Sequence, residues 1–82
     1  MINLTSLIEA AKVILANRFD AQRFLSWQSL ALSTLTNLLG PLHYYTQNFK
    51  IFTTERNERS LLAGEGILIA ARENITPQVQ VI

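Results

Sequence analysis

The sequence predicts a small all-α protein, a bundle of about four helices, and three observations lead to that fold class. The stretch from Phe24 to Phe49 carries no formal charge, and its leucines recur at the three- and four-residue steps of a helix. Residues that favour helix ends divide the chain, above all Asp20 and the pair Gly40-Pro41. With 82 residues, 49% of them apolar, the chain has the size of one domain and too much apolar content for disorder.

The first helix is predicted over residues 4–17. Asn3 can cap it, and a later start is open because Ser6 and Glu9 also have capping-box spacing. Its apolar residues share one side of the helix: Leu4, Leu7, Ile8, Ala11, Ile14 and Leu15. The next capping residue follows soon after, so the turn is short and the second helix should pack antiparallel to the first.

The second helix is predicted over residues 20–39, with Asp20 as its N-cap. Phe19 and Phe24 have the spacing of a hydrophobic staple. One broad face of the helix is apolar and is expected to face the core: Ala21, Phe24, Leu25, Ala31, Leu32, Leu35, Leu38 and Leu39. Trp27 lies off this stripe, at the edge marked by Leu30, where aromatic residues often anchor interfaces.

Another face of the second helix is polar but carries no charge: Gln22, Ser26, Ser29, Ser33 and Asn37. A helix face that is wholly open to water usually carries charged residues. The pattern therefore predicts that this face is partly covered. Cover by another helix of the same chain is the favoured interpretation, and cover by a second subunit is the alternative.

The third helix is predicted over residues 41–52. Gly40 can adopt the left-handed conformation that ends a helix, and Pro41 suits the first turn of the next one. Its apolar positions are expected at Leu42, Tyr45, Phe49 and Phe52. A strand over residues 49–54 is the alternative, because that run is aromatic and β-branched.

The fourth helix is predicted over residues 55–73, with Thr53 or Thr54 as its cap. Its apolar side is expected to contain Leu62, Ala63, Ile67, Ile69 and Ala70. Gly64 and Gly66 weaken the prediction, so a turn at 64–66 followed by a strand over 67–71 stays open. The helical domain is expected to cover residues 1–76, and residues 77–82 are expected to form an extended tail or linker.

Composition argues against several classes of function. The chain has no cysteine and one histidine, so we expect no disulfide, no metal site and no cofactor. The neutral stretch holds too many Ser, Thr, Gln and Asn residues for a membrane span. A net charge of +1 argues against a dedicated nucleic-acid surface. Glu9 and Lys12 interrupt the first apolar run, so no signal-peptide pattern is visible and the cytoplasm is the expected compartment.

No group of residues predicts catalysis, and we expect no enzymatic activity. His43 has no acidic residue near it in sequence that could act as its partner. The glycines at positions 64 and 66 lack the third glycine and preceding strand of a phosphate-binding motif. The charged run over residues 55–59 is interpreted as a solvated ion-pair face.

Four short runs occur in an order known from other proteins: F-x-x-W at 24–27, L-x-x-L-L-G at 35–40, Y-x-x-x-F at 45–49 and G-I-L-x-A-A-R-E at 66–73. Over these residues the chain resembles the small helical domain at the N-termini of bacterial abortive-infection and predicted TIR-like nucleotide-binding proteins. In those proteins the helical part is an accessory or assembly module, and the chemistry lies in a separate domain. The resemblance implies an interaction role in a bacterial defence setting, and it brings no catalytic residue.

The sequence therefore predicts a non-catalytic helical interaction or oligomerisation module. Its partner is expected to be a second copy or another protein. The predicted interface lies on the second helix and consists of Ser26, Trp27, Ser29, Leu30, Ser33 and Asn37. The alternative is a small nucleic-acid-binding or regulatory protein, for which the candidate phosphate contacts are Arg18, Arg23, Arg56 and Arg59.

Overall fold

The structure, a computed structural model, describes residues 3–75, and this part of the chain folds into four α-helices without a strand. The helices are α1 (Leu4–Ala16), α2 (Ala21–Leu39), α3 (Tyr44–Phe52) and α4 (Glu58–Ile75). The predicted all-α class is confirmed, and the four ranges match the predicted ones to within three residues at each end. The expected tail over residues 77–82 lies outside the described residues.

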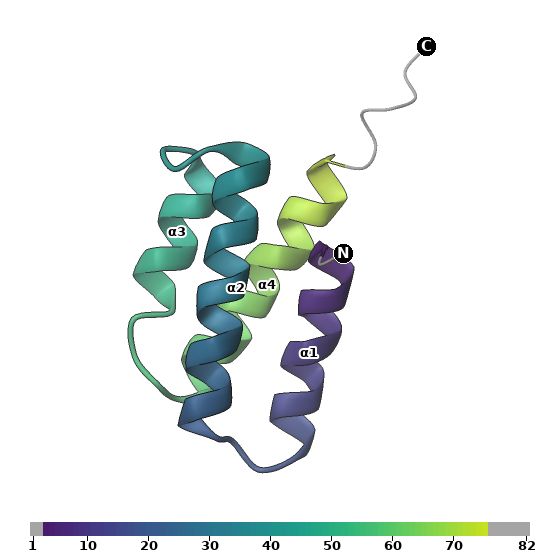
Figure 1. Ribbon diagram of the computed structural model, residues 1–82, viewed down its shortest axis with the longest axis vertical. Helices are drawn as coiled ribbons and strands as arrows, with labels where there is room; N and C mark the ends of the chain where they lie inside the picture. The colour runs from purple at the N-terminus through teal and green to yellow at the C-terminus, as the bar shows by residue number, and fades with distance from the viewer. Residues whose placement is uncertain (1–2, 76–82) are drawn as a thin grey trace.

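The helices run alternately up and down, and each packs against the one before it in the chain (Figure 1). α4 closes the bundle because it packs against both α1 and α3, which themselves stand diagonally apart. The connections α1–α2 and α3–α4 lie at one end of the bundle (Figure 1). The α2–α3 connection, the start of α1 and the end of α4 lie at the other.

The caps of α1 and α2 are those predicted from the sequence. The Asn3 side chain accepts a hydrogen bond from the Ser6 amide at 2.8 Å. The Asp20 carboxylate accepts from two amides of the first turn of α2, at 2.8 and 3.2 Å. The staple is also confirmed, because the rings of Phe19 and Phe24 lie 5.7 Å apart between centroids. These contacts satisfy amides that a helix N-terminus otherwise leaves unpaired.

α3 begins three residues later than predicted. Gly40 ends α2 with φ +97° and ψ 155°, so the chain leaves the helix in an extended direction and Pro41 enters a turn. His43 is the N-cap of α3, and its Nδ1 accepts a hydrogen bond from the Tyr45 amide at 3.1 Å. Gln47 donates to the Pro41 carbonyl at 2.7 Å and holds the turn against the helix. The alternative of a strand over 49–54 is wrong.

The start of α4 was also predicted too early. Thr53 is the C-cap of α3, and its hydroxyl donates to the Phe49 carbonyl at 2.6 Å. Asn57 caps α4 instead, accepting from the Ser60 amide at 2.9 Å. The helix continues through both glycines, so the turn-and-strand alternative for residues 64–71 is wrong.

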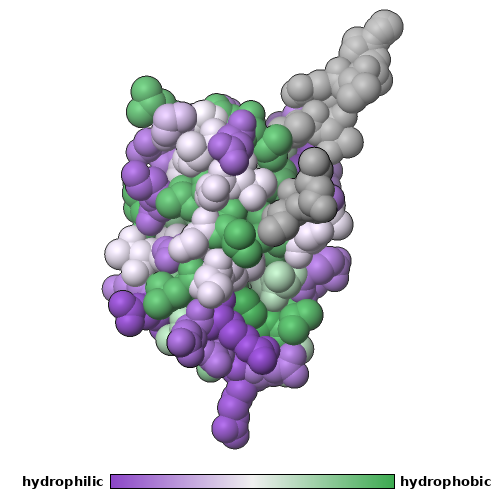
Figure 2. Space-filling model, viewed as in Figure 1, coloured by the Kyte–Doolittle hydropathy of each residue, from purple (hydrophilic) through white to green (hydrophobic). Residues whose placement is uncertain are grey.

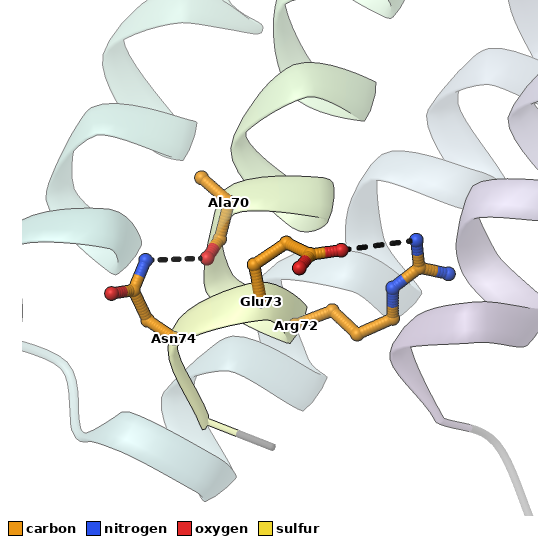
Figure 3. Close-up of polar contacts among 4 residues, drawn as sticks. All are labelled: Ala70, Arg72, Glu73 and Asn74. Carbon is orange, nitrogen blue, oxygen red and sulfur yellow. Dashed lines mark hydrogen bonds and ion pairs between the residues drawn. The ribbon is translucent and has the colours of Figure 1, made fainter. Parts of the chain in front are cut away.

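The end of α4 is tied to α3 by a side chain. Asn74 donates to the Ala70 carbonyl at 2.8 Å and to the Tyr45 hydroxyl at 2.7 Å. Figure 3 shows Asn74 on one side of α4 and the Arg72–Glu73 ion pair on another, with 3.8 Å between the charged atoms. A side-chain contact therefore holds the last turn of α4 against a neighbouring helix.

The buried side of α4 differs from the predicted one by about one residue. The sequence suggested a side that included Leu62, yet that side chain is 53% exposed. The buried positions are Ser60, Leu61, Gly64, Leu68 and Ala71. Gly64 stands near the centre of this buried side. Because a glycine adds nothing to an apolar pattern, the apolar residues of the sequence indicated a side next to the one that is buried. Leu42 and Phe52, which were predicted among the apolar positions of the third helix, are also exposed.

The core is one cluster to which all four helices contribute, and Trp27 connects them. Its indole nitrogen donates to the Leu7 carbonyl of α1 at 2.9 Å. Its ring lies 5.8 Å from Phe24 in α2 and 5.6 Å from Phe49 in α3, measured between centroids. The same ring faces Gly64 of α4 so closely that an added Cβ would lie 2.8 Å from it. Trp27 is only 3% exposed.

The position of Trp27 corrects the predicted orientation of α2. The residues of α2 that are buried are Phe24, Trp27, Ala31 and Leu35. Leu25 and Leu38, placed on the core face from the sequence, are 37% and 54% exposed. Leucines occupy a wide arc of this helix, and their spacing alone cannot tell which edge of the arc is covered by neighbours.

None of the helices within residues 3–75 is both long enough and apolar enough to span a membrane.

Candidate functional site: the groove between α1 and α2

An open groove of about 660 Å³ runs between α1 and α2. Its size is within the range of ligand and docking sites. Most of its lining is apolar, and the charged residues Asp20 and Arg23 lie among the residues that line its α2 side. The lining residues are Leu7, Ala10, Val13, Ile14, Asp20, Gln22, Arg23, Ser26, Trp27 and Leu30.

Two aliphatic side chains keep much of their surface in water at this groove. Val13 of α1 is 51% exposed and Leu30 of α2 is 46% exposed. Trp27 also lines the groove, although its N–H is already paired with Leu7 inside the bundle. The groove is thus an apolar surface that the described part of the chain leaves uncovered.

The uncharged polar face of α2 continues from this groove along the helix. All five of its residues are exposed: Gln22, Ser26, Ser29, Ser33 and Asn37. The favoured interpretation, cover by another helix of the same chain, is therefore wrong for the described residues. In Figure 2 the middle of the molecule, over α2, is pale and green, while deep purple gathers at the lower end.

The six residues of the predicted interface divide into two groups. Ser26, Trp27 and Leu30 line the groove, and Ser29, Ser33 and Asn37 are exposed elsewhere on the same helix. Trp27 does not stand on an exposed edge as expected, because it belongs to the core and shows only its margin to the groove.

Sequence reasoning missed the α1 side of the groove. Leu7 and Ile14 belonged to the predicted core stripe, and nothing in the spacing indicated that they also border an opening. Val13 was the one residue whose type could have indicated this side of the groove from the sequence. It is a large β-branched residue off the stripe of α1, and an exposed helix position gains nothing from such a residue by itself.

Four arginines lie near the end of the bundle where the α1–α2 and α3–α4 connections meet: Arg18, Arg23, Arg56 and Arg59. The ion-pair face expected over residues 55–59 is not formed, because among residues 3–75 the only ion pair joins Arg72 to Glu73. Glu55 instead accepts a hydrogen bond from Asn57 at 3.2 Å, and Asp20 serves as the α2 cap.

His43 is used for structure. It is exposed, caps α3 through Nδ1 and stacks on Tyr45 with 5.4 Å between ring centroids. Within the part of the chain described, no three His, Cys, Asp or Glu side chains gather in a way that could hold a metal ion. The groove and the exposed face of α2 form the candidate site, and their apolar and neutral polar side chains are suited to binding.

Comparison with other proteins gives no relative: no protein-family model matches the chain, and neither a curated protein nor a solved structure matches it.

Proposed function

We propose that this chain is a non-catalytic helical module that associates with a second copy of itself through the outer side of α2. One observation carries the proposal: α2 exposes five polar residues without a charge next to an open apolar groove. Exposed helices normally carry charges, which keep proteins dissolved and apart. A face that lacks them loses little when a partner removes it from water, because no ion must be desolvated.

The side chains on this face also suit close packing. Ser26, Ser29 and Ser33 are small, so another helix can approach their backbone. Their hydroxyl groups can pair with each other or with backbone carbonyls when they are covered. Leu30 and Val13 supply apolar surface that is still in water, and its burial would stabilise a complex by about 25 cal/mol per Å².

A second copy is the simplest partner because a symmetric dimer buries the same patch twice. A short chain without disulfides has a small core, and oligomerisation is a common way to stabilise such chains. The resemblance to the accessory helical domain of bacterial defence proteins agrees with an assembly role, and that setting is part of the proposal.

The test is sedimentation equilibrium at tens of micromolar protein on the wild type and on Ser29→Glu. We expect a dimer for the wild type and a shift toward monomer for Ser29→Glu, because the variant would bury an unpaired carboxylate or place two carboxylates together. Thr5→Glu is the matched control. Thr5 is an exposed hydroxyl residue on α1 that does not line the groove, so this variant should remain dimeric.

A wild type that is monomeric under these conditions would end the proposal. A dimer that tolerates Ser29→Glu would move the interface away from this face of α2.

A second candidate function is binding to nucleic acid, and it rests on the four arginines at the loop end of the bundle. Their guanidinium groups form no ion pair with the described carboxylates and are available for phosphates. An electrophoretic shift of DNA or RNA that weakens steeply with salt would favour this candidate, because phosphate contacts release counterions. The absence of a shift at low salt would leave self-association as the only proposal.

A further inference from the structure

We infer that the two copies lie antiparallel, with Leu30 of each inserted into the α1–α2 groove of the other. The inference rests on the self-association proposed above and specifies its geometry. It names the occupant of the groove as α2 of a second copy of this chain.

The groove and Leu30 match in position. On the α2 side the groove is lined from Asp20 to Leu30, so its middle lies near Ser26. A second α2 that places its Leu30 over this middle aligns the partner's Leu30 with Ser26. Symmetry then aligns Leu30 with the partner's Ser26, and the two-fold axis crosses α2 near position 28. The small side chain of Ser26 leaves room for the leucine beside it.

The same register brings the only charged residue within α2 opposite a neutral one. Five residues before the axis lies Arg23, and five residues after it lies Ser33. In this arrangement the Arg23 guanidinium faces the partner's Ser33, whose hydroxyl and nearby backbone carbonyls can accept its hydrogen bonds. Asn37 falls near the partner's Asp20, where its amide can donate to the exposed carboxylate.

Charge selects the antiparallel direction over the parallel one. A parallel pair of α2 helices would place Arg23 beside the partner's Arg23 and Asp20 beside the partner's Asp20. In the antiparallel register the two Arg23 positions are about 15 Å apart along the helix axis, at about 1.5 Å per residue. That separation exceeds the Debye length of about 8 Å at physiological salt, so the like charges are screened from each other.

The chain offers a direct test because it contains no cysteine, so each introduced cysteine is unique. Arg23→Cys and Ser33→Cys proteins are prepared separately, mixed in the reduced state, equilibrated and oxidised, and the disulfide-linked species are separated without reductant. Each variant carries a distinct mass tag, so that mixed and self-linked dimers can be counted. Both positions are exposed, and circular dichroism verifies that each variant folds.

We expect mixed dimers, in which position 23 of one chain is linked to position 33 of the other, to exceed the random share of pairs. A disulfide needs Cβ atoms about 3.5–4.5 Å apart, and the proposed register brings only the mixed pair near that range. The control mixes Arg23→Cys with Leu42→Cys, a position that is 84% exposed in the α2–α3 connection. That mixture should give no more mixed dimers than random pairing.

A second measurement tests the inserted leucine. Leu30→Ala should raise the dimer dissociation constant at least tenfold, while Leu62→Ala, a leucine of similar exposure on α4, should leave it unchanged. The single tryptophan, Trp27, lines the groove, so its emission in the wild type should change on dilution through the dissociation constant.

The outcomes separate the two proposals. If sedimentation shows a dimer but self-linked pairs dominate after oxidation, the antiparallel register is wrong and the self-association proposal is unaffected. A dimer in which Leu30→Ala and Leu62→Ala behave alike overturns the insertion into the groove. A monomeric wild type overturns both proposals. This holds even if the groove then binds a helix of another protein or a small apolar compound.

Discussion

The two faces of α2 differ in what constrains them. The inner face carries Phe24, Trp27, Ala31 and Leu35, which the other three helices cover almost completely. The outer face carries exposed serines and amides. Packing within the monomer explains why the residues of the inner face are apolar. It does not explain why the outer face carries no charge. The inner face holds the monomer together, and the outer face is the surface that we propose for self-association.

The largest effect is expected where the four helices meet. Trp27→Ala would leave a large cavity and remove the hydrogen bond to Leu7, so we expect the free energy of unfolding to fall by about 3–5 kcal/mol. A loss of that size is a large part of the stability of a small domain. Urea unfolding followed by circular dichroism at about 222 nm measures it, since the variant has no tryptophan and the helical signal reports the fold.

Trp27→Phe is the matched variant for this position. It keeps an aromatic ring against Phe49 and Gly64 but loses the indole N–H, so its cost should be clearly smaller than that of Trp27→Ala. Equal losses would show that the hydrogen bond to Leu7, rather than ring packing, holds the junction together.

A smaller effect separates the two glycines of α4. An added Cβ at Gly64 would lie 2.8 Å from Thr53 and Trp27 and 2.9 Å from Phe49, whereas one at Gly66 meets nothing within 4 Å. Overpacking costs about 1–3 kcal/mol, and replacing a helical glycine by alanine gains about 1 kcal/mol. We therefore expect Gly64→Ala to lower the free energy of unfolding by up to about 2 kcal/mol and Gly66→Ala to raise it by up to about 1 kcal/mol.

The two glycine variants are compared by thermal and urea unfolding under the same conditions. Changes of the same sign in both would contradict the close approach at Gly64.

The cap of α2 should matter about as much as one hydrogen-bonded contact. Asp20→Ala removes the acceptor for the Gln22 and Arg23 amides, and we expect a loss of about 1 kcal/mol in the free energy of unfolding. Asp20→Asn keeps an acceptor of similar geometry and should lose only a few tenths of that value. The same urea titrations decide the point, and equal losses in the two variants would assign the effect to charge instead of capping.

The smallest effect on folding is expected on the outer face of α2. Ser29→Glu and Ser33→Glu, measured at protein concentrations low enough to keep the chain monomeric, should change the free energy of unfolding by no more than about 0.5 kcal/mol. A loss above about 1 kcal/mol in dilute protein would mean that this face is part of the monomer's own packing, and the contrast between the two faces would fail.

Local features of the chain were predictable because they depend on neighbours in sequence. Asn3 and Asp20 cap their helices through amides two or three residues away, and Phe19 meets Phe24 across one turn. The helical class and the antiparallel order follow from such short-range rules and from the period of the apolar residues. The capping role of Asn57 could have been found by the same rules, but Thr53 and Thr54 are also suitable caps. His43 is not among the preferred N-cap residues, and Pro41 suited the first turn of the helix, so the sequence favoured an earlier start.

The tertiary structure decided which part of each helix is covered, because burial depends on neighbours that are distant in sequence. Gly64 is buried since Trp27, Phe49 and Thr53 converge on it from two other helices and a helix end, and no local pattern records that meeting. Trp27 is buried and not on the exposed edge that the sequence predicted. Its N–H donates to the Leu7 carbonyl, and its ring packs in the space left by Gly64. The groove beside Trp27 is formed by two helices together, and α1 and α2 leave Val13 and Leu30 uncovered there. The sequence of either helix alone does not contain this arrangement.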